Sequence, residues 1–232
     1  MAILRERAFR VLELRLFASA RSAGRQPGFT DRQLQVKEVT PGCLDGYRLV
    51  PVGAGTAVSR EVVPRAAEAG AAVVDKSSAY RLSPQVPLVV PEVNLTARAG
   101  YQGIIANPNC TTIQPVEALA PLARAAGLER VGMSSYQSVA GTELTQLSQG
   151  ALAGDPVRSQ VYPYPIPLDL LPHIDSFDDQ ECNGEERKLM AETRKILDLP
   201  ELHTSATVVR VLAYRGHDMP VMVEPCERLT RA

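Results

Sequence analysis

The 232-residue sequence lacks an excess of basic residues and lacks long apolar runs. Lys and Arg number 25 against 26 Asp and Glu, so the formal net charge is −1. This balance does not favour nucleic acid as a partner. The longest apolar runs are far too short to span a bilayer, so we expect no membrane-spanning segment and no membrane partner.

Cysteine is also scarce, and its spacing is uninformative. The four cysteines are scattered and form no CxxC pair, so the sequence indicates neither a zinc site nor a disulfide framework. The first 24 residues have no separate hydrophobic region and no small-residue cleavage site, so we expect no signal peptide. We therefore expect a protein without a bound metal in the reducing cytoplasm.

What is present is an ordinary globular composition with 45% apolar and 22% charged residues. The length allows one large or two small domains. The first hundred residues alternate short apolar segments with a helix-like segment. Strands are expected in 12–19 and 86–94. The segment 47–55 is expected to form a strand followed by a Gly-rich turn, and 71–81 a strand followed by a polar turn. A helix is expected in 59–70 that stops at Gly70. This alternation is typical of parallel βαβ units.

The pattern changes from about Val131. A strand is expected from Arg130, a charged amphipathic helix over 185–197, and a long strand over 203–217. This order is more α+β than doubly wound. We predict an α/β protein with domains at 1–109 and 110–232.

One cysteine stands where chemistry is favoured. In "GIIANPNCTTIQ", a short strand ends in a breaker cluster, and Asn109 is a good N-cap for a helix running from Cys110 to Gly127. A thiol in the first helical turn lies at the positive end of the helix macrodipole, which favours the nucleophilic thiolate. The competing interpretation is a small buried cysteine used for packing.

Seven segments between Val73 and His217 together resemble one family, and the match as a whole runs in order from about Val11 to His217. They are "VVDKSSAYR", "VPLVVPEVN", "GIIANPNCTTIQ", "SYQSVAG", "PHIDSF", "EERKLMAETRKIL" and "SATVVRVLAYRGH". Several independent motifs at compatible spacing are more specific than one motif alone. The sequence closely resembles aspartate-semialdehyde dehydrogenases. These enzymes catalyse the reversible NADP-dependent conversion of aspartate 4-semialdehyde and phosphate to 4-aspartyl phosphate, in lysine, threonine and methionine biosynthesis.

The resemblance implies a set of catalytic residues. Cys110 matches the nucleophile, Asn109 the residue that orients the acyl group, and Gln137 a glutamine beside the thiol. His217 matches the catalytic histidine, which can exchange a proton near neutral pH. A thiol suits the reaction because it is both a good nucleophile and a good leaving group.

The resemblance also implies substrate contacts. Arg210 matches the arginine that binds the substrate carboxylate, and its planar fork suits a bidentate contact. Glu185 matches the contact to the amino group, and Lys188 and Arg81 match the phosphate site. Without the family match, Glu185 and Lys188 read as an ordinary ion pair at i and i+3. Arg210 and His217 are seven positions apart, so a turn at Arg215-Gly216 must intervene if both face the thiol.

The cofactor side departs from the family pattern. Residues after the second strand and in a second glycine-rich turn match NADP contacts, namely Ser19, Arg21, Ser22, Gly53, Ala54 and Gly55. No GxGxxG loop precedes Leu12, and residues 1–10 resemble the tail of the helix that follows such a loop. Only 15 residues follow His217. We therefore expect a truncated Rossmann-like domain followed by an incomplete α+β catalytic and dimerisation domain.

Smaller departures accompany these. Lys76 stands where the family usually has Asn, and it could either aid phosphate binding or disturb its turn. The segment between Val139 and Leu144 is shorter than usual. We assign His173 and His203 to structure rather than catalysis, and Cys43, Cys182 and Cys226 to packing or the surface.

Two rival interpretations remain open at this stage. The chain could be a non-catalytic truncated paralogue or fragment of the family. It could also be a related acylating reductase such as N-acetyl-glutamyl-phosphate reductase. Sequences of that enzyme share the cysteine nucleophile but lack the E-x-x-K helix. The family resemblance further implies a homodimer or homotetramer.

Overall fold

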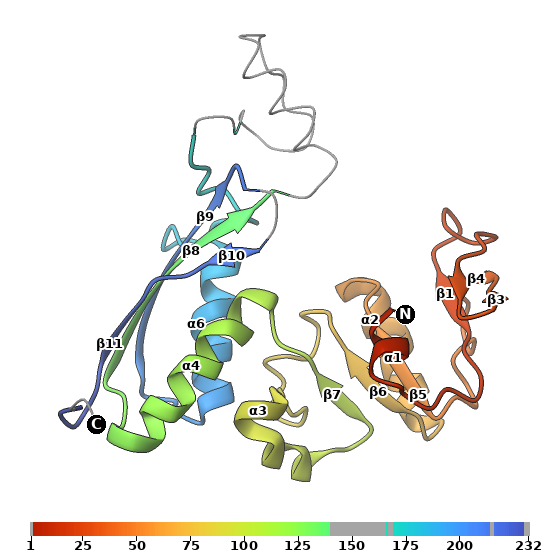
Figure 1. Ribbon diagram of the computed structural model, residues 1–232, viewed down its shortest axis with the longest axis horizontal. Helices are drawn as coiled ribbons and strands as arrows, with labels where there is room; N and C mark the ends of the chain where they lie inside the picture. Colours follow the sequence, from red (N-terminus) through yellow and green to blue (C-terminus); the bar gives the residue numbers. More distant parts are fainter. Residues whose placement is uncertain (1, 140–165, 167–168, 214–215, 230–232) are drawn as a thin grey trace, which may run out of the picture.

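The computed structural model describes residues 2–139, 166, 169–213 and 216–229, and its elements form an α/β arrangement with parallel strand pairs (Figure 1). The predicted fold class is confirmed. No helix in these described ranges is long and apolar enough to cross a membrane.

The first half centres on a parallel three-stranded sheet. Its strands are β5 (Leu49–Val52), β6 (Ala72–Asp75) and β7 (Ile104–Ala106), in that order across the sheet. Helix α2 (Thr56–Glu68) connects β5 to β6, and its buried residues Val62, Val63 and Ala66 pack with β5 and β6. The expected strand–helix–strand unit is therefore present, and Gly70, at φ +90°, follows the helix end as predicted.

A separate set of short elements precedes this sheet. Helix α1 (Ala2–Glu6) is followed by β1 (Leu16–Ala18), which pairs in parallel with β4 (Val36–Glu38), while β2 (Gly28–Phe29) and β3 (Arg32–Gln33) form a small hairpin. The strand expected over 12–19 is only three residues long. Leu12 is 78% exposed, so no neighbouring strand or core extends the pairing to it.

The expectation of a strand over 86–94 is largely wrong. This segment makes one isolated parallel bridge, Leu88 to Ala106, and then forms helix α3 (Pro91–Asn94) and the 3₁₀ helix η1 (Leu95–Gly100). Pro91 has no N–H to donate to a ladder and suits the first position of a helix. The Asn94 side chain bonds the Val90 N–H and the Leu88 carbonyl, which fixes the change of direction.

The second half is a mixed four-stranded sheet with two long helices against one face (Figure 1). The central strand β8 (Arg130–Ser138) pairs in parallel with β9 (His203–Val211) and antiparallel with β10 (His217–Asp218) and β11 (Val221–Glu224). Helices α4 (Cys110–Ala126) and α6 (Gly184–Leu197) supply Leu119 and Leu189 to the core beneath.

The long strand expected over 203–217 is divided. Strand β9 ends at Val211 and β10 begins at His217, with Gly216 at φ +89° just before it. Gly216 fits the reversal predicted there, because only glycine adopts this backbone freely. Arg215, and the expected shortening beyond Val139, lie outside the described residues.

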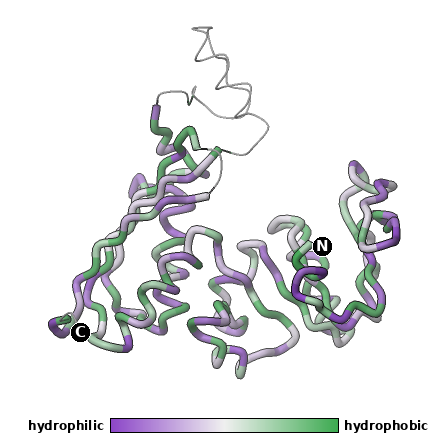
Figure 2. The backbone as a smooth tube through the Cα atoms, in the orientation of Figure 1, coloured by the Kyte–Doolittle hydropathy of each residue, from purple (hydrophilic) through white to green (hydrophobic). Residues whose placement is uncertain are grey.

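The two helices described in the second half, α4 and α6, begin at asparagine caps. The Asn109 side chain accepts the Thr111 N–H, as expected of an N-cap, and α4 then continues through Pro115 and Pro121 to Ala126, with Gly127 as its C-cap. Asn183 and Glu186 form a reciprocal capping box at the start of α6. Figure 2 shows α6 as largely hydrophilic, yet it buries Leu189 and Ile196. Two polar residues of α6, Glu185 and Glu192, hydrogen bond to Asn109 at the start of α4.

Candidate active site

The Cys110 thiol lies at the first residue of α4, exposed at the end of the loop that leaves β7. Its Sγ lies 3.4 Å from Oδ1 of Asn109 and 3.6 Å from Nε2 of His217. A sulfur this close to an imidazole nitrogen can pass its proton to that nitrogen. The Asn109 oxygen also accepts the Thr111 N–H, so the cap and the thiol share one amide group.

Three of the expected residues lie in one row across the sheet. Gln137 of β8 is the register partner of Arg210 on β9 and of His217 on β10. Residues that are directly opposite in neighbouring strands point to the same face of a sheet. This face is the one covered by α4 and α6, because it also carries the buried residues Val131 and Met133.

Gln137 connects the sheet to the start of α4. Its Nε2 donates to Thr111 Oγ1 at 3.0 Å, and its side chain is buried. Arg210 Nη1 donates to the Ser138 carbonyl at 3.2 Å. Nδ1 of His217 is buried without a hydrogen-bond partner among the described residues.

Helix α6 brings an ion pair, Glu185 and Lys188, to the Asn109 side chain beside Cys110. Asn109 Nδ2 donates to Glu185 Oε2 at 2.7 Å, and Lys188 Nζ donates to Glu185 Oε1 at 2.8 Å and to Asp175 Oδ2 at 3.0 Å. Burial lowers the pKa of Lys188, but its hydrogen bonds to Glu185 and Asp175 outweigh burial and hold that pKa above its ordinary value. The lysine therefore carries a positive charge at neutral pH.

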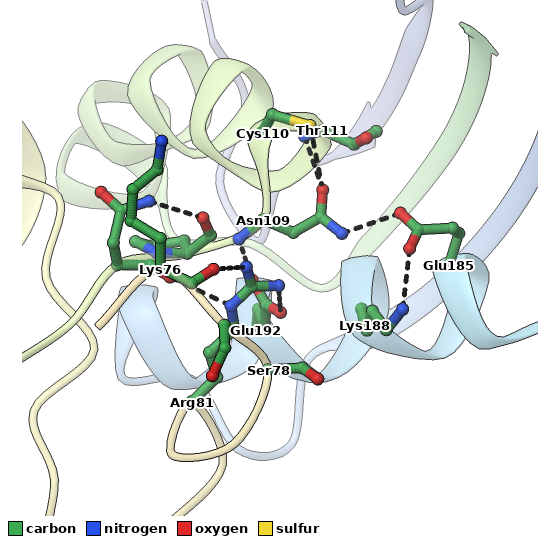
Figure 3. Close-up of polar contacts among 12 residues, drawn as sticks. Lys76, Ser78, Arg81, Asn109, Cys110, Thr111, Glu185, Lys188 and Glu192 are labelled. Atoms are coloured by element: carbon green, nitrogen blue, oxygen red, sulfur yellow. Dashed lines mark hydrogen bonds and ion pairs between the residues drawn. The ribbon is translucent and has the colours of Figure 1, made fainter. Parts of the chain in front are cut away.

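Arg81 approaches the other side of the same asparagine (Figure 3). It is buried, its Nη1 lies 3.1 Å from Glu192 Oε1, and Glu192 Oε2 accepts the Asn109 N–H at 2.7 Å. Its Nε and Nη2 donate to the carbonyls of Asn107 and Lys76. All three guanidinium nitrogens therefore have protein partners.

The turn that carries Arg81 is formed with Lys76 in place. The Lys76 N–H donates to the Val52 carbonyl at 2.8 Å. The buried Asp75 carboxylate accepts bonds from the hydroxyls of Ser59 and Ser77. The turn makes these hydrogen bonds with Lys76 in place, and the Lys76 side chain is exposed beside the site.

The residues expected to bind the cofactor lie in two exposed turns. Ser19, Arg21 and Ser22 follow β1, where the Ser22 N–H donates to the Ser19 carbonyl. Gly53, Ala54 and Gly55 connect β5 to α2, with Gly55 at φ +89° as the N-cap. A Cβ added at Gly53 or Gly55 would meet no heavy atom within 4 Å, so the backbone there is open to a ligand.

The residues set aside in the sequence lie away from this cluster of bonds. His173 packs edge-on against Phe177 with ring centroids 5.1 Å apart, and His203 begins β9. Burial raises the pKa of the Cys182 thiol, and the carboxylate of Glu186 adds to this effect. Cys226 is exposed near Gly127, at the opposite end of α4 from Cys110.

Sequence reasoning missed three residues of the cluster. Thr111 follows the cysteine, Asp175 lies within "PHIDSF", and Glu192 lies within "AETRKIL". A signal existed for Glu192, because it is seven residues after Glu185 and two helical turns place both on one face. Asp175 and Thr111 gave no signal of this kind.

Comparison with known proteins identifies the family. The model "Semialdehyde dehydrogenase, NAD binding domain" matches residues 1–100, and "Semialdehyde dehydrogenase, dimerisation domain" matches 119–228. An aspartate-semialdehyde dehydrogenase of Prochlorococcus marinus is 43% identical over 233 residues, covering 98% of this chain and 68% of that protein. The chain belongs to the aspartate-semialdehyde dehydrogenase family.

Solved structures of the family agree with this fold. Aspartate semialdehyde dehydrogenase II from Vibrio cholerae superposes with a TM-score of 0.94 at 38% identity, covering 98% of this chain and 70% of that one. The same enzyme in complex with ASA gives a TM-score of 0.93. The family predicted from the sequence motifs is therefore confirmed, and these relatives do not bear the name of the rival reductase.

Proposed function

We propose that this protein is an aspartate-semialdehyde dehydrogenase that uses Cys110 as its nucleophile and His217 as its acid–base residue. One observation carries the proposal. Cys110 Sγ lies 3.6 Å from His217 Nε2, and His217 shares a sheet row with Gln137 and Arg210. The proposed nucleophile and proton acceptor are therefore neighbours, and the proposed cation for the substrate carboxylate lies on the same face of the sheet.

The chemistry follows from these positions. His217 Nε2 takes the thiol proton as Sγ attacks the aldehyde carbon, and returns it to the carbonyl oxygen to give a thiohemiacetal. NADP, when bound, supplies the acceptor for the hydride that leaves this carbon. His217 takes the hydroxyl proton as the thioester forms, and a phosphate oxygen then attacks the thioester carbon and expels the Cys110 thiolate. Asn109 and Gln137 orient the acyl group at the start of α4.

The substrate is held at its two charged ends. Arg210 binds the carboxylate with its planar fork, and Glu185 accepts the amino group. Glu185 lies one hydrogen bond from Asn109, so the amino-group contact and the nucleophile's loop are mechanically connected. This connection supports a fixed distance between the bound substrate and Sγ.

Phosphate binds near Lys188 and Arg81 in this proposal. Both cations already have carboxylate partners, Glu185 and Asp175 for Lys188 and Glu192 for Arg81. A doubly charged phosphate that replaces or shares one of these partners remains paired with a cation. The exposed Lys76 adds positive charge beside them.

The cofactor turns fit a dinucleotide in part. Gly53 to Gly55 leave an open backbone at the N-terminus of the 13-residue helix α2, which suits a phosphate group. Arg21, with Ser19 and Ser22, offers charge and hydroxyl groups for a 2′-phosphate. This set favours NADP over NAD.

We further propose a homodimer formed through the sheet of the second half, with a homotetramer as the alternative assembly. Tyr136 and Met222 are 38% and 76% exposed and lie on the sheet face opposite the helices, where Met222 is the register partner of Gly132. Apolar exposure on one continuous face is typical of an interface. Domain limits of 1–109 and 110–232 and a cytoplasmic location complete the proposal.

The activity itself tests the function. Reduction of NADP by the purified chain should require both aspartate semialdehyde and phosphate, and Cys110→Ser should abolish it. Reduction that proceeds equally well in the Ser variant would contradict the proposal. Light scattering after size exclusion gives the assembly, and a monomer at micromolar concentration would contradict the proposed dimer.

A further inference from the structure

Glu192 is a buried carboxylate to which the proposed reaction assigns no task. It is 1% exposed, in the middle of α6, on the same helix face as Glu185. A buried carboxylate is costly unless its oxygens are hydrogen bonded or paired with a cation. The partners of Glu192 therefore indicate why the chain keeps it there.

Each oxygen of Glu192 holds a different element of the site. Oε2 accepts the backbone N–H of Asn109 at 2.7 Å, directly before Cys110, and Oε1 accepts Nη1 of Arg81 at 3.1 Å (Figure 3). One side chain thus joins the loop that ends at the nucleophile to the turn that carries a proposed phosphate ligand.

A neighbouring lysine holds the same turn at three further points. Lys195, one helical turn beyond Glu192, donates through Nζ to the carbonyls of Arg81, Ser83 and Val86 at 2.7, 2.7 and 2.9 Å. The segment 81–86 comes from the first half of the chain, whereas α6 belongs to the second. Helix α6 therefore fixes both halves at the site.

Asn109 is held from two sides by the same helix. Its backbone N–H is bonded to Glu192 and its side chain to Glu185. Burial raises the pKa of Glu192, while the Asn109 N–H and the Arg81 guanidinium oppose the rise. The Thr112 side chain also opposes the rise. Burial lowers the pKa of Lys195, and the Glu192 charge in turn opposes that lowering.

We propose that Glu192 is a positioning residue that sets the place of Cys110, through the Asn109 N–H, relative to the phosphate-binding guanidinium of Arg81. The proposal rests on the proposed function, because it takes Arg81 and Cys110 as members of one site. It assigns Glu192 no contact with substrate. Its removal should displace the nucleophile and the phosphate site together.

The experiment compares Glu192→Gln with Glu117→Gln, the same substitution at an exposed position of α4. Gln keeps the size of Glu, but its amide can accept from Asn109 only by turning a donor toward Arg81. Alkylation of Cys110 by iodoacetamide, read by peptide mapping, should slow on the order of tenfold, because displaced thiols lose their neighbouring histidine. The Glu117 variant should match wild type.

Steady-state kinetics give the second reading. In Glu192→Gln the KM for phosphate should rise while the KM for the aldehyde changes little, and kcat should fall on the order of 10²-fold. A purely structural role would lower the amount of folded enzyme without this split between the two KM values. Near-UV circular dichroism and the melting temperature report folding.

A folded Glu192→Gln variant with wild-type alkylation of Cys110 would overturn the inference. If that variant does not fold, Glu192→Asp decides in the same way, because its shorter side chain cannot reach both partners. Amide hydrogen exchange tests the same hydrogen bond in the wild-type protein, without any substitution. The Asn109 N–H, which donates to Glu192, should be strongly protected, and rapid exchange there would also overturn the inference.

These outcomes separate the inference from the proposed function. Wild-type protein that reduces no NADP would contradict the function, yet alkylation and hydrogen exchange would still report on Glu192. Conversely, if the enzyme is active and Glu192→Gln leaves the alkylation rate of Cys110 unchanged, the proposed function stands and the positioning role of Glu192 is wrong.

Discussion

Arg210 and His217 lie in one row of the sheet, one on each side of Gln137, although β9 and β10 run in opposite directions. The chain reverses between them, and Gly216 adopts the positive φ that this reversal requires. Both side chains therefore share the face that carries the start of α4. The carboxylate-binding and proton-transferring groups of the proposed site depend on this one reversal.

Arg210→Lys should damage catalysis far more than its preserved charge suggests. A lysine offers a point charge instead of a planar fork, so the bound aldehyde carbon loses its alignment with Sγ. We expect kcat/KM to fall on the order of 10²-fold, or roughly 2.7 kcal/mol of transition-state stabilisation. Arg130→Lys, at an exposed pair with Glu224, is the matched control. Activity within a factor of about three of wild type would remove Arg210 from the site.

Asp175 should stabilise the folded protein near neutral pH and lose this contribution at acid pH. The hydrogen bond from Lys188, together with the Ser176 N–H, holds the pKa of Asp175 below its ordinary value of 3.8. A group with a lowered pKa in the folded state stabilises the fold above its unfolded pKa and loses this effect as the pH falls through the folded pKa. The melting temperatures of wild type and Asp175→Asn should therefore differ at pH 6 and converge well below pH 3.8.

The control for this series is Asp179→Asn, at an exposed position of the same loop. It should show no comparable convergence. Equal melting curves of wild type and Asp175→Asn at pH 6 would contradict this prediction. The ion pair with Lys188 would then add nothing measurable to stability, which is true of many exposed ion pairs.

Arg21→Ala should change the choice of cofactor more than the affinity for dinucleotides in general. Loss of one charge-assisted bond to the 2′-phosphate costs roughly 1.5–3 kcal/mol, so NADP should bind more than about tenfold weaker while NAD binding changes little. Calorimetric titration with both dinucleotides measures this, with Arg25→Ala as the control. Parallel losses for NADP and NAD would place the 2′-phosphate elsewhere.

Asn183→Ala should destabilise the protein through helix α6. The Asn183 side chain accepts the Glu186 N–H at 3.0 Å and donates to the Pro172 carbonyl at 3.3 Å. Loss of an N-cap costs about 1–2 kcal/mol, measured as the free energy of unfolding in urea. Asn183→Asp keeps the acceptor and should lose less. An Ala variant as stable as wild type would show that Glu186 alone suffices at this helix start.

Much of this fold could be predicted from local signals. The breaker cluster at 107–109 and the helical spacing after it predicted α4 and its Asn109 cap, and both are present. The segment 86–94 could not be predicted in the same way, because its β-branched residues favour a strand whereas tertiary contacts allow only one bridge there.

The site was less accessible to sequence reasoning than the fold. Family motifs predicted Cys110, Gln137, Arg210 and His217 as members, but their shared row depends on strand register, which the residues alone do not give. The bond between Arg81 and Glu192 joins positions 111 apart in the chain. The sequence around either residue gives no signal that predicts this ion pair. The same is true of the ion pair between Lys188 and Asp175.

The central claim is that Cys110 carries the acyl group of the substrate. The most direct measurement incubates the purified chain with aspartate semialdehyde and NADP without phosphate, then maps adducts by mass spectrometry of acid-quenched peptides. We predict a thioester on Cys110 that disappears on adding phosphate, with Cys226, which is also exposed, unmodified. An adduct on Cys226 with Cys110 untouched, or NADP reduction with no adduct on Cys110, would contradict the account.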